Sequence, residues 1–195
     1  MRIFKRPLAF AAGRLKRLGC RADQVSIAGF CIGLGVIPAL WYQVYWLALL
    51  CIALNRIGDG LDGALARLTV PSDAGGYLDI VLDFIFYSSV VLGFALADPL
   101  ANGLAASVLL FTFVGTGSSF LAFAIMAERR GIENIVYPSK GIYYLGGLAE
   151  GTETLLCFIL CCFFPQNFAI FAYSFAAICL ITIVTRLVYG YLQLR

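Results

Sequence analysis

Histidine is absent from this chain of 195 residues, and charged residues make up only 13% of it. The absence of imidazole excludes a histidine metal ligand, an imidazole base and a Ser-His-Asp triad. The low charge, against roughly 25% in a soluble domain, excludes a disordered chain and a basic nucleic-acid-binding module. Hydrophobic residues instead make up 62% of the chain, which indicates an integral membrane protein.

The cysteines do not form a recognisable framework. There are seven of them, with no C-x-x-C pair, and the odd number argues against a disulfide scaffold. A thiolate metal site is one reading, but nearly all seven lie in apolar stretches, where cysteine packs as a small hydrophobic residue. We therefore assign them no chemistry.

Six apolar stretches follow the N-terminal segment, and a helix needs roughly 20 apolar residues to cross a bilayer. They cover residues 25–43, 45–66, 75–97, 104–127, 142–164 and 167–192, with breaks at proline, glycine, asparagine and charged residues. These stretches predict an all-α membrane protein with six transmembrane helices, which form one domain over residues 23–195.

The N-terminal segment, residues 1–22, is strongly basic. Half of the 14 lysines and arginines fall within the first 21 residues, interleaved with apolar side chains. This pattern predicts an amphipathic helix on an anionic membrane surface. A cleavable signal peptide is less suitable, because the apolar run Leu8–Ala12 is too short for its hydrophobic region.

The remaining basic residues predict the orientation. The connections near residues 43–45, 98–103 and 165–167 contain no lysine or arginine, whereas the other connections and both ends do. Under the positive-inside rule, both termini are then cytoplasmic. Trp41 and Trp46 are placed in an aromatic belt at the outer interface.

Four of the 11 acidic residues lie in or at the edge of the second and third apolar stretches. Asp59 and Asp62 are three apart, and Asp79 and Asp83 are four apart, so each pair shares one helix face. A short cytoplasmic turn joins the two helices, which predicts antiparallel neighbours with converging carboxylates. Such residues cost several kcal/mol in hydrocarbon unless they are paired or face a polar cavity.

Converging carboxylates without histidine favour a hard cation such as Mg²⁺, Mn²⁺ or Ca²⁺. Space for two ions, the arrangement common in phosphoryl chemistry, is expected. Arg67, one turn beyond Asp62, is a candidate clamp for phosphate oxygens. Two other interpretations remain open from spacing alone: an ion pathway, or structural salt bridges with Arg56 and Arg67.

The acids and their surroundings resemble the signature of the CDP-alcohol phosphotransferases, D-x-x-D-G-x-x-A-R followed by G-x-x-x-D-x-x-x-D. Every named position is present with a seven-residue spacer, and the segment Asp23–Ser26 is similar to the family's N-x-V-T. The matching positions are Asp59, Asp62, Gly63, Ala66, Arg67, Gly75, Asp79 and Asp83. The resemblance implies an N-terminal surface helix followed by a six-helix catalytic domain.

The resemblance also implies roles for these residues. Asp59, Asp62 and Asp79 would coordinate Mg²⁺ or Mn²⁺, and Asp83 would coordinate metal and act as general base. Gly63 and Ala66 would leave space for the cytidine, and Arg67 would hold the diphosphate. Gly75 would keep the start of the third helix close to the nucleotide. Ser26 would also belong to the substrate-binding residues.

The expected reaction is transfer of a phosphatidyl group from CDP-diacylglycerol to the hydroxyl of a small polar alcohol, with release of CMP. The alternatives are transfer of a CDP-linked head group to diacylglycerol, and a non-enzymatic cation transporter. Family members that use phosphorylated acceptors look as though they carry basic residues after a serine on the fourth helix. In this chain Ser119 is followed by apolar residues, so that basic cluster is missing and a phosphorylated acceptor is less expected. The candidate acceptor pocket is Lys140, Glu150, Glu153 and Arg186.

Assembly and location follow from the same resemblance. Two motifs permit close helix contact, either within the chain or between copies: Gly29-x-x-x-Gly33 and Gly147-x-x-x-Gly151. Because homodimers are common in the family that the sequence resembles, we expect a homodimer. We expect an integral protein of a bacterial inner membrane, with its active site on the cytoplasmic side and no nucleic-acid partner.

Overall fold

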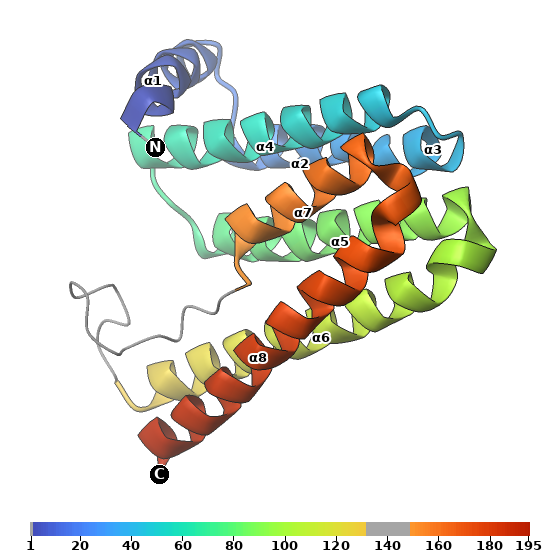
Figure 1. Cartoon of the computed structure of the whole chain (residues 1–195). Coiled ribbons are helices and arrows are strands. Elements are labelled where there is room, and N and C mark those ends of the chain that lie inside the picture. Colours follow the sequence, from blue (N-terminus) through green and yellow to red (C-terminus); the bar gives the residue numbers. More distant parts are fainter. Residues whose placement is uncertain (1, 132–148) are drawn as a thin grey trace. The chain divides into compact units, whose positions relative to one another are not determined.

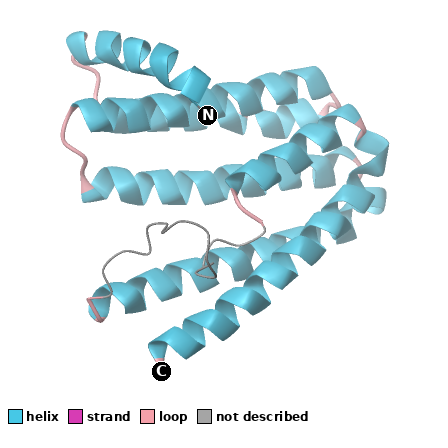
Figure 2. Ribbon diagram, turned by 60° about the vertical axis from the view of Figure 1, so that its left-hand side comes forward, coloured by secondary structure: helices cyan, strands magenta, loops and turns pink. Residues whose placement is uncertain are grey.

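The computed structural model describes residues 2–131 and 149–195, and within them the chain is helical, without strands (Figures 1 and 2). The chain divides into two compact units, Met1–Ala97 and Asp98–Arg195. Each unit contains its own buried core.

The first unit contains helices α1 (Arg2–Arg17), α2 (Ala22–Leu34), α3 (Val36–Trp41), α4 (Tyr45–Leu68) and α5 (Asp73–Ala97). The first predicted apolar stretch therefore forms two helices, separated at Gly35. Pro38 contributes to this break, because it has no N–H to donate to the carbonyl of residue 34. Together α2 and α3 are long enough to cross a membrane.

Helices α2 and α3 form the centre of the first unit. α2 packs on α4 and also contacts α5, while α3 packs on α5. α4 and α5 run antiparallel (Figure 1), as predicted, but approach each other less closely than each approaches α2. Polar side chains make the contacts between α4 and α5: Arg56 of α4 pairs with Asp83 of α5, and aspartates of both helices lie close together.

The N-terminal helix α1 packs against α4. Ala12 is fully buried with Ala64 and Leu65 in one apolar cluster. A Cβ on Gly60 would lie 3.2 Å from a methyl group of Leu8, and Lys16 donates to the Leu68 carbonyl at the end of α4. One face of α1 thus packs against α4, the helix that carries Asp59 and Asp62.

The second unit contains α6 (Pro99–Arg129), α7 (Gly151–Phe163), the short 3-10 helix η1 (Pro165–Asn167) and α8 (Phe168–Leu194). Asp98 caps α6 by accepting from the Ala101 N–H at 3.0 Å, with Pro99 at the first helical position. Phe113 on α6 meets Phe158 of α7 and Phe175 of α8 edge to face, which joins the three α-helices of this unit.

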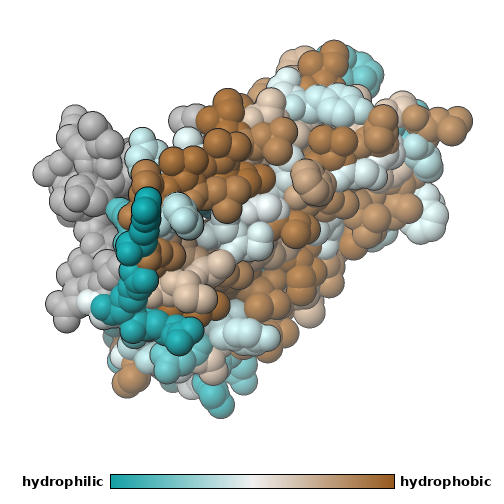
Figure 3. All heavy atoms as spheres, turned by 90° about the horizontal axis from the view of Figure 1, so that it is seen from below, coloured by the Kyte–Doolittle hydropathy of each residue, from teal (hydrophilic) through white to brown (hydrophobic). Residues whose placement is uncertain are grey.

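Four segments within the described residues are long and apolar enough to cross a membrane: Ala22–Trp41, Asp73–Ala97, Pro99–Arg129 and Pro165–Leu194. α4 is 24 residues long but carries several charges, and α7 is a shorter apolar helix of 13 residues. Hydrophobic side chains predominate on the face shown in Figure 3. This surface suits helices that meet lipid.

Candidate metal and nucleotide site

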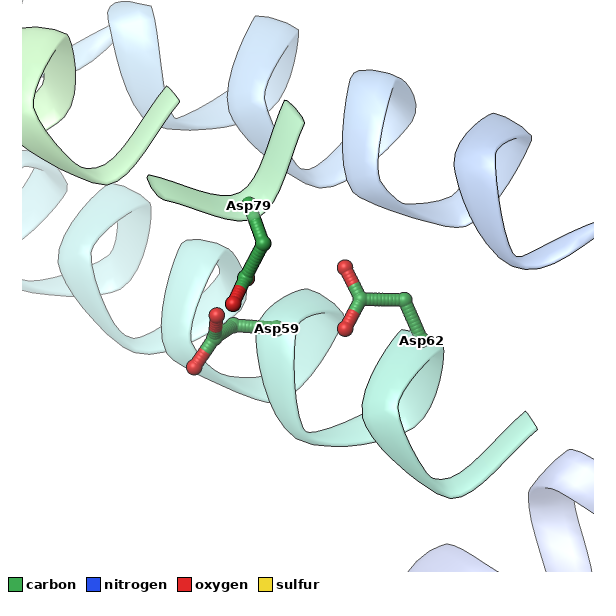
Figure 4. Close-up of side chains that lie close together, drawn as sticks. All are labelled: Asp59, Asp62 and Asp79. Atoms are coloured by element: carbon green, nitrogen blue, oxygen red, sulfur yellow. The ribbon is translucent and has the colours of Figure 1, made fainter. Parts of the chain in front are cut away.

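Three aspartates of the first unit form one carboxylate group. Asp59 and Asp62 come from α4 and Asp79 from α5, and their carboxylates point toward one another in Figure 4. One oxygen from each lies within 4.8 Å of the others. The predicted convergence of carboxylates from the two helices is therefore present for these three residues.

The distances within this group favour a positive partner. Three carboxylates with oxygens within 4.8 Å of one another repel when they are ionised, and a bound cation removes that repulsion. An all-oxygen donor set of this kind fits Mg²⁺ or Mn²⁺ and does not fit metals that prefer sulfur.

Asp83, the fourth predicted member, has a different partner. Its Oδ1 lies 2.5 Å from Nη2 of Arg56, and its Oδ2 lies 3.4 Å from Nη1. Arg56 also approaches Asp59, with 3.6 Å between Nη1 and Oδ2. Asp83 therefore lies beside the three-carboxylate group but is held in a two-point ion pair.

The close crossing of α2 and α4 places the acids of α4. Gly29 and Gly58 face each other, and a Cβ on Gly58 would lie 3.0 Å from the Gly29 Cα. Ser26, one turn before Gly29, lies near Asp62 and donates to the Ala22 carbonyl at 3.2 Å. Asp62 is 7% exposed, so its charge has little contact with water.

The predicted glycines lie at close approaches around the site. Arg67 is exposed and folds back over Gly63, where a Cβ would meet its Nη1 at 3.4 Å. Ala66, the other predicted small residue, is half-buried. At the start of α5 the Gly75 N–H donates to Ser72 Oγ at 3.0 Å.

Gly75 also brings α5 close to α2. A Cβ on Gly75 would lie 3.3 Å from Asp23 Oδ1. Ser26, Gly63, Arg67 and Gly75 thus all belong to the first unit, on α2, α4 and α5.

The predicted acceptor residues belong to the other part of the chain. Lys140 lies outside the described residues. Arg186 is 9% exposed on α8, where Nη1 donates to the Thr116 carbonyl at 2.9 Å and the guanidinium stacks over Phe120. Glu150 lies within electrostatic range of Arg186.

Glu150 and Glu153 occur at the N-terminus of α7, not within its apolar part. The Glu150 N–H donates to Glu153 Oε2 at 3.2 Å, as in a capping box. Both side chains are exposed. Capping of α7 is therefore a sufficient structural reason for Glu153.

Sequence reasoning named Arg56 only as a salt-bridge partner and did not identify Asn55. Asn55 is 5% exposed, and its side chain bonds both Arg56 and the Gly29 carbonyl. A polar side chain one turn before Asp59 in an apolar helix was the available signal.

The sequence also matches known proteins. The pattern of the CDP-alcohol phosphatidyltransferase family matches residues 20–188, which is most of the chain. This chain belongs to the CDP-alcohol phosphatidyltransferase family. It is thus a membrane enzyme of phospholipid biosynthesis, and the three-carboxylate group lies within the matched region.

Two curated relatives differ in how much they share with it. The chain is 53% identical over 181 residues to the inner membrane protein YnjF of Escherichia coli, covering 93% of this chain and 88% of that protein. It is 38% identical over 93 residues to the archaetidylinositol phosphate synthase of Pyrococcus horikoshii, covering 47% of this chain and 50% of that one.

Solved structures share the fold. The phosphatidylinositol phosphate synthase PgsA1 of Mycobacterium tuberculosis, solved with CDP-DAG bound, is 20% identical with a TM-score of 0.68, covering 95% of this chain and 94% of that one. The same enzyme in complex with manganese and citrate has a TM-score of 0.69 at 19% identity, covering 94% and 88%.

Proposed function

We propose that this enzyme transfers the phosphatidyl group of CDP-diacylglycerol to the hydroxyl of a small polar alcohol and releases CMP. The observation that carries the proposal is the group formed by Asp59, Asp62 and Asp79, three carboxylate oxygens within 4.8 Å of one another, in a chain of this family. The related fold of PgsA1, solved with CDP-DAG, supports the choice of donor.

Asp59, Asp62 and Asp79 are the proposed ligands of Mg²⁺ or Mn²⁺. Bound metal would neutralise the diphosphate and the charge that develops on it during transfer. Two ions are proposed, as in other phosphoryl-transfer sites. Binding of a second ion would draw on Asp83, whose carboxylate keeps lone pairs beyond the two that Arg56 uses.

Asp83 is also the proposed general base. It accepts the proton of the acceptor hydroxyl, whose oxygen forms a bond to the phosphorus that bears the diacylglycerol. The bond from that phosphorus to the bridging diphosphate oxygen breaks, and CMP leaves with this oxygen. Arg67, the last residue of the first part of the signature, is proposed to hold the diphosphate by paired N–H donors.

Small residues complete the proposed nucleotide site. Gly63 and Ala66 leave room for the cytidine, and Gly75 lets the start of α5 lie close to α2. Ser26 is proposed to act through Asp62, the carboxylate that lies near it.

The acceptor site is proposed at Lys140, Glu150, Glu153 and Arg186. Arg186 is the best supported of these, because a buried guanidinium in an apolar helix is costly unless it has partners or a function. Its contact with the Thr116 carbonyl occupies one of its donors.

The proposed membrane arrangement has six crossings, with residues 1–22 on the surface and both termini and the active site cytoplasmic. α4 would be the second crossing, since 24 residues extend roughly 36 Å at 1.5 Å each. The distribution of lysine and arginine and the inner-membrane relative support a bacterial inner membrane.

A homodimer is proposed from the family resemblance alone. The glycine motif on α2 is used inside the chain, where Gly29 meets Gly58 and Gly33 meets the Asn55 side chain. Gly147 of the second motif lies outside the described residues. Chemical cross-linking of the purified enzyme in nanodiscs tests this assembly.

An acceptor screen tests the reaction. Purified enzyme with CDP-diacylglycerol and Mn²⁺ is given a panel of alcohols with and without a phosphate group, and CMP and the lipid product are measured by mass spectrometry. A phosphatidyl alcohol is expected. If a lipid product forms only from a CDP-linked head group and diacylglycerol, the proposal is contradicted. The enzyme would then transfer the head group to diacylglycerol.

A further inference from the structure

Arg56 connects the proposed base to the carboxylate group. Its two terminal nitrogens contact the two oxygens of Asp83 at 2.5 and 3.4 Å, and Nη1 lies 3.6 Å from Asp59 Oδ2. Both ion pairs recorded for Asp59 and Asp83 among the described residues are with this guanidinium. Arg56 is therefore the cation shared by α4 and α5 at the site.

The guanidinium is itself held in one orientation. Asn55 Oδ1 accepts from its Nε at 3.0 Å and from its Nη2 at 2.6 Å, and Asn55 in turn donates to the Gly29 carbonyl at 3.3 Å. The Tyr87 hydroxyl accepts from Nη1 at 3.2 Å. The rings of Phe86 and Tyr87 lie 5.2 and 5.3 Å from the guanidinium carbon.

These contacts form a continuous path from the backbone of α2 through α4 to a carboxylate of α5. An isolated aspartate on a helix can rotate about its side-chain bonds, whereas a two-point pair with a fixed guanidinium selects one orientation. A base acts only when its oxygen is within hydrogen-bond reach of the proton it removes. The network thus has the geometry needed to orient Asp83.

We propose that Arg56 is a positioning residue for Asp83: it fixes the carboxylate beside the three-aspartate group and supplies charge compensation there. This inference rests on the proposed function, because that function assigns the base to Asp83. The competing role is purely structural, in which the ion pair only ties α4 to α5. If Arg56 positions Asp83, folded Arg56 variants lose turnover. If its role is only structural, folded Arg56 variants retain turnover.

The experiment compares Arg56→Lys, Arg56→Gln and the matched control Arg195→Lys in nanodiscs. For each variant, kcat and KM for CDP-diacylglycerol are measured with the alcohol found by the acceptor screen. Mn²⁺ binding by electron paramagnetic resonance and the unfolding temperature are measured on the same samples. Tyr87→Phe is a milder fourth variant, which removes one contact of Arg56 and keeps the ion pair.

Arg56→Lys keeps the charge but loses the two-point geometry, so kcat should fall at least about tenfold with KM nearly unchanged. Arg56→Gln should lower kcat further and tighten Mn²⁺ binding, because a positive charge next to Asp59 is removed. Tyr87→Phe should lower kcat by a smaller factor. Arg195→Lys should match the wild type.

Folded Arg56 variants with wild-type kcat would overturn the proposal, whatever their unfolding temperature. A rise in KM at constant kcat would overturn it too, since Arg56 would then bind substrate. If both Arg56 variants unfold, an unchanged kcat in Tyr87→Phe counts against it. A wild type that releases no CMP with any alcohol refutes the proposed function instead, and Mn²⁺ binding then still decides whether Arg56 acts on the carboxylates.

Discussion

Gly58 on α4 lies directly against Gly29 on α2, so closely that a methyl group on Gly58 would be 3.0 Å from the Gly29 Cα. Gly58→Ala should therefore force the two helices apart and destabilise the protein by about 1–3 kcal/mol. The measurement is thermal unfolding in detergent, with Gly103→Ala as control because its added methyl group meets nothing within 4 Å. Equal unfolding temperatures for the two variants would contradict the close crossing.

Metal removal should stop the reaction. A chelator is expected to abolish CMP release, and Mg²⁺ or Mn²⁺ should restore it. Asp62→Asn should weaken metal binding by at least the roughly 10–100-fold that loss of an outer-shell partner costs. Asp98→Asn is the matched control, since asparagine also caps helix α6; activity that is indifferent to chelation would refute the metal site.

Asp83→Asn should remove the proposed general base while the proposed nucleotide site stays intact. Turnover is expected to fall by about 10²–10⁴-fold, the usual contribution of a positioned base. Binding of CDP-diacylglycerol, measured by a fluorescent analogue, should persist. Wild-type turnover in this variant would show that another group removes the proton.

Arg67→Ala should weaken the binding of CDP-diacylglycerol by about 10–100-fold, because charge-assisted hydrogen bonds contribute about 1.5–3 kcal/mol. Arg67→Lys should fall between this variant and the wild type, since it keeps the charge without the paired donors. The dissociation constant is the quantity to measure. Arg195→Ala provides the control, and an affinity unaltered by Arg67→Ala would argue that Arg67 does not hold the diphosphate.

Arg186→Met should raise the KM for a phosphorylated acceptor if Arg186 belongs to the acceptor site, with little change for CDP-diacylglycerol. The reason is that a guanidinium binds phosphate oxygens directly. The acceptor panel supplies the comparison between phosphorylated and plain alcohols. If Arg186→Met and the wild type have the same KM for every acceptor, Arg186 instead serves packing with Thr116 and Phe120.

The spacing of the aspartates was sufficient to predict the carboxylate group. Separations of three and four residues place each pair on one helix face, and a short turn makes the helices antiparallel. Asp59, Asp62 and Asp79 follow that prediction. The pairing of Asp83 with Arg56 could not be chosen over metal coordination from sequence, because spacing gives the shared face but not which of several charges come into contact.

Other features depended on contacts that periodicity does not encode. The break at Gly35 arises within an apolar stretch that reads as one helix. The glycine motif on α2 allowed contact within the chain or between copies, and the facing position of Gly58 became visible only in three dimensions. The apolar stretch 142–164 includes Glu150 and Glu153, whereas helix α7 begins at Gly151, so the two glutamates lie at its start.

The Arg56 network has a consequence for the order of events during biogenesis. Because one of the site's cations is part of the polypeptide and is already paired with Asp83, part of the negative charge is balanced as soon as α4 and α5 meet. Packing of α4 against the rest of the first unit then need not wait for a metal ion. A metal that binds the carboxylates would meet a unit whose charges are already partly balanced.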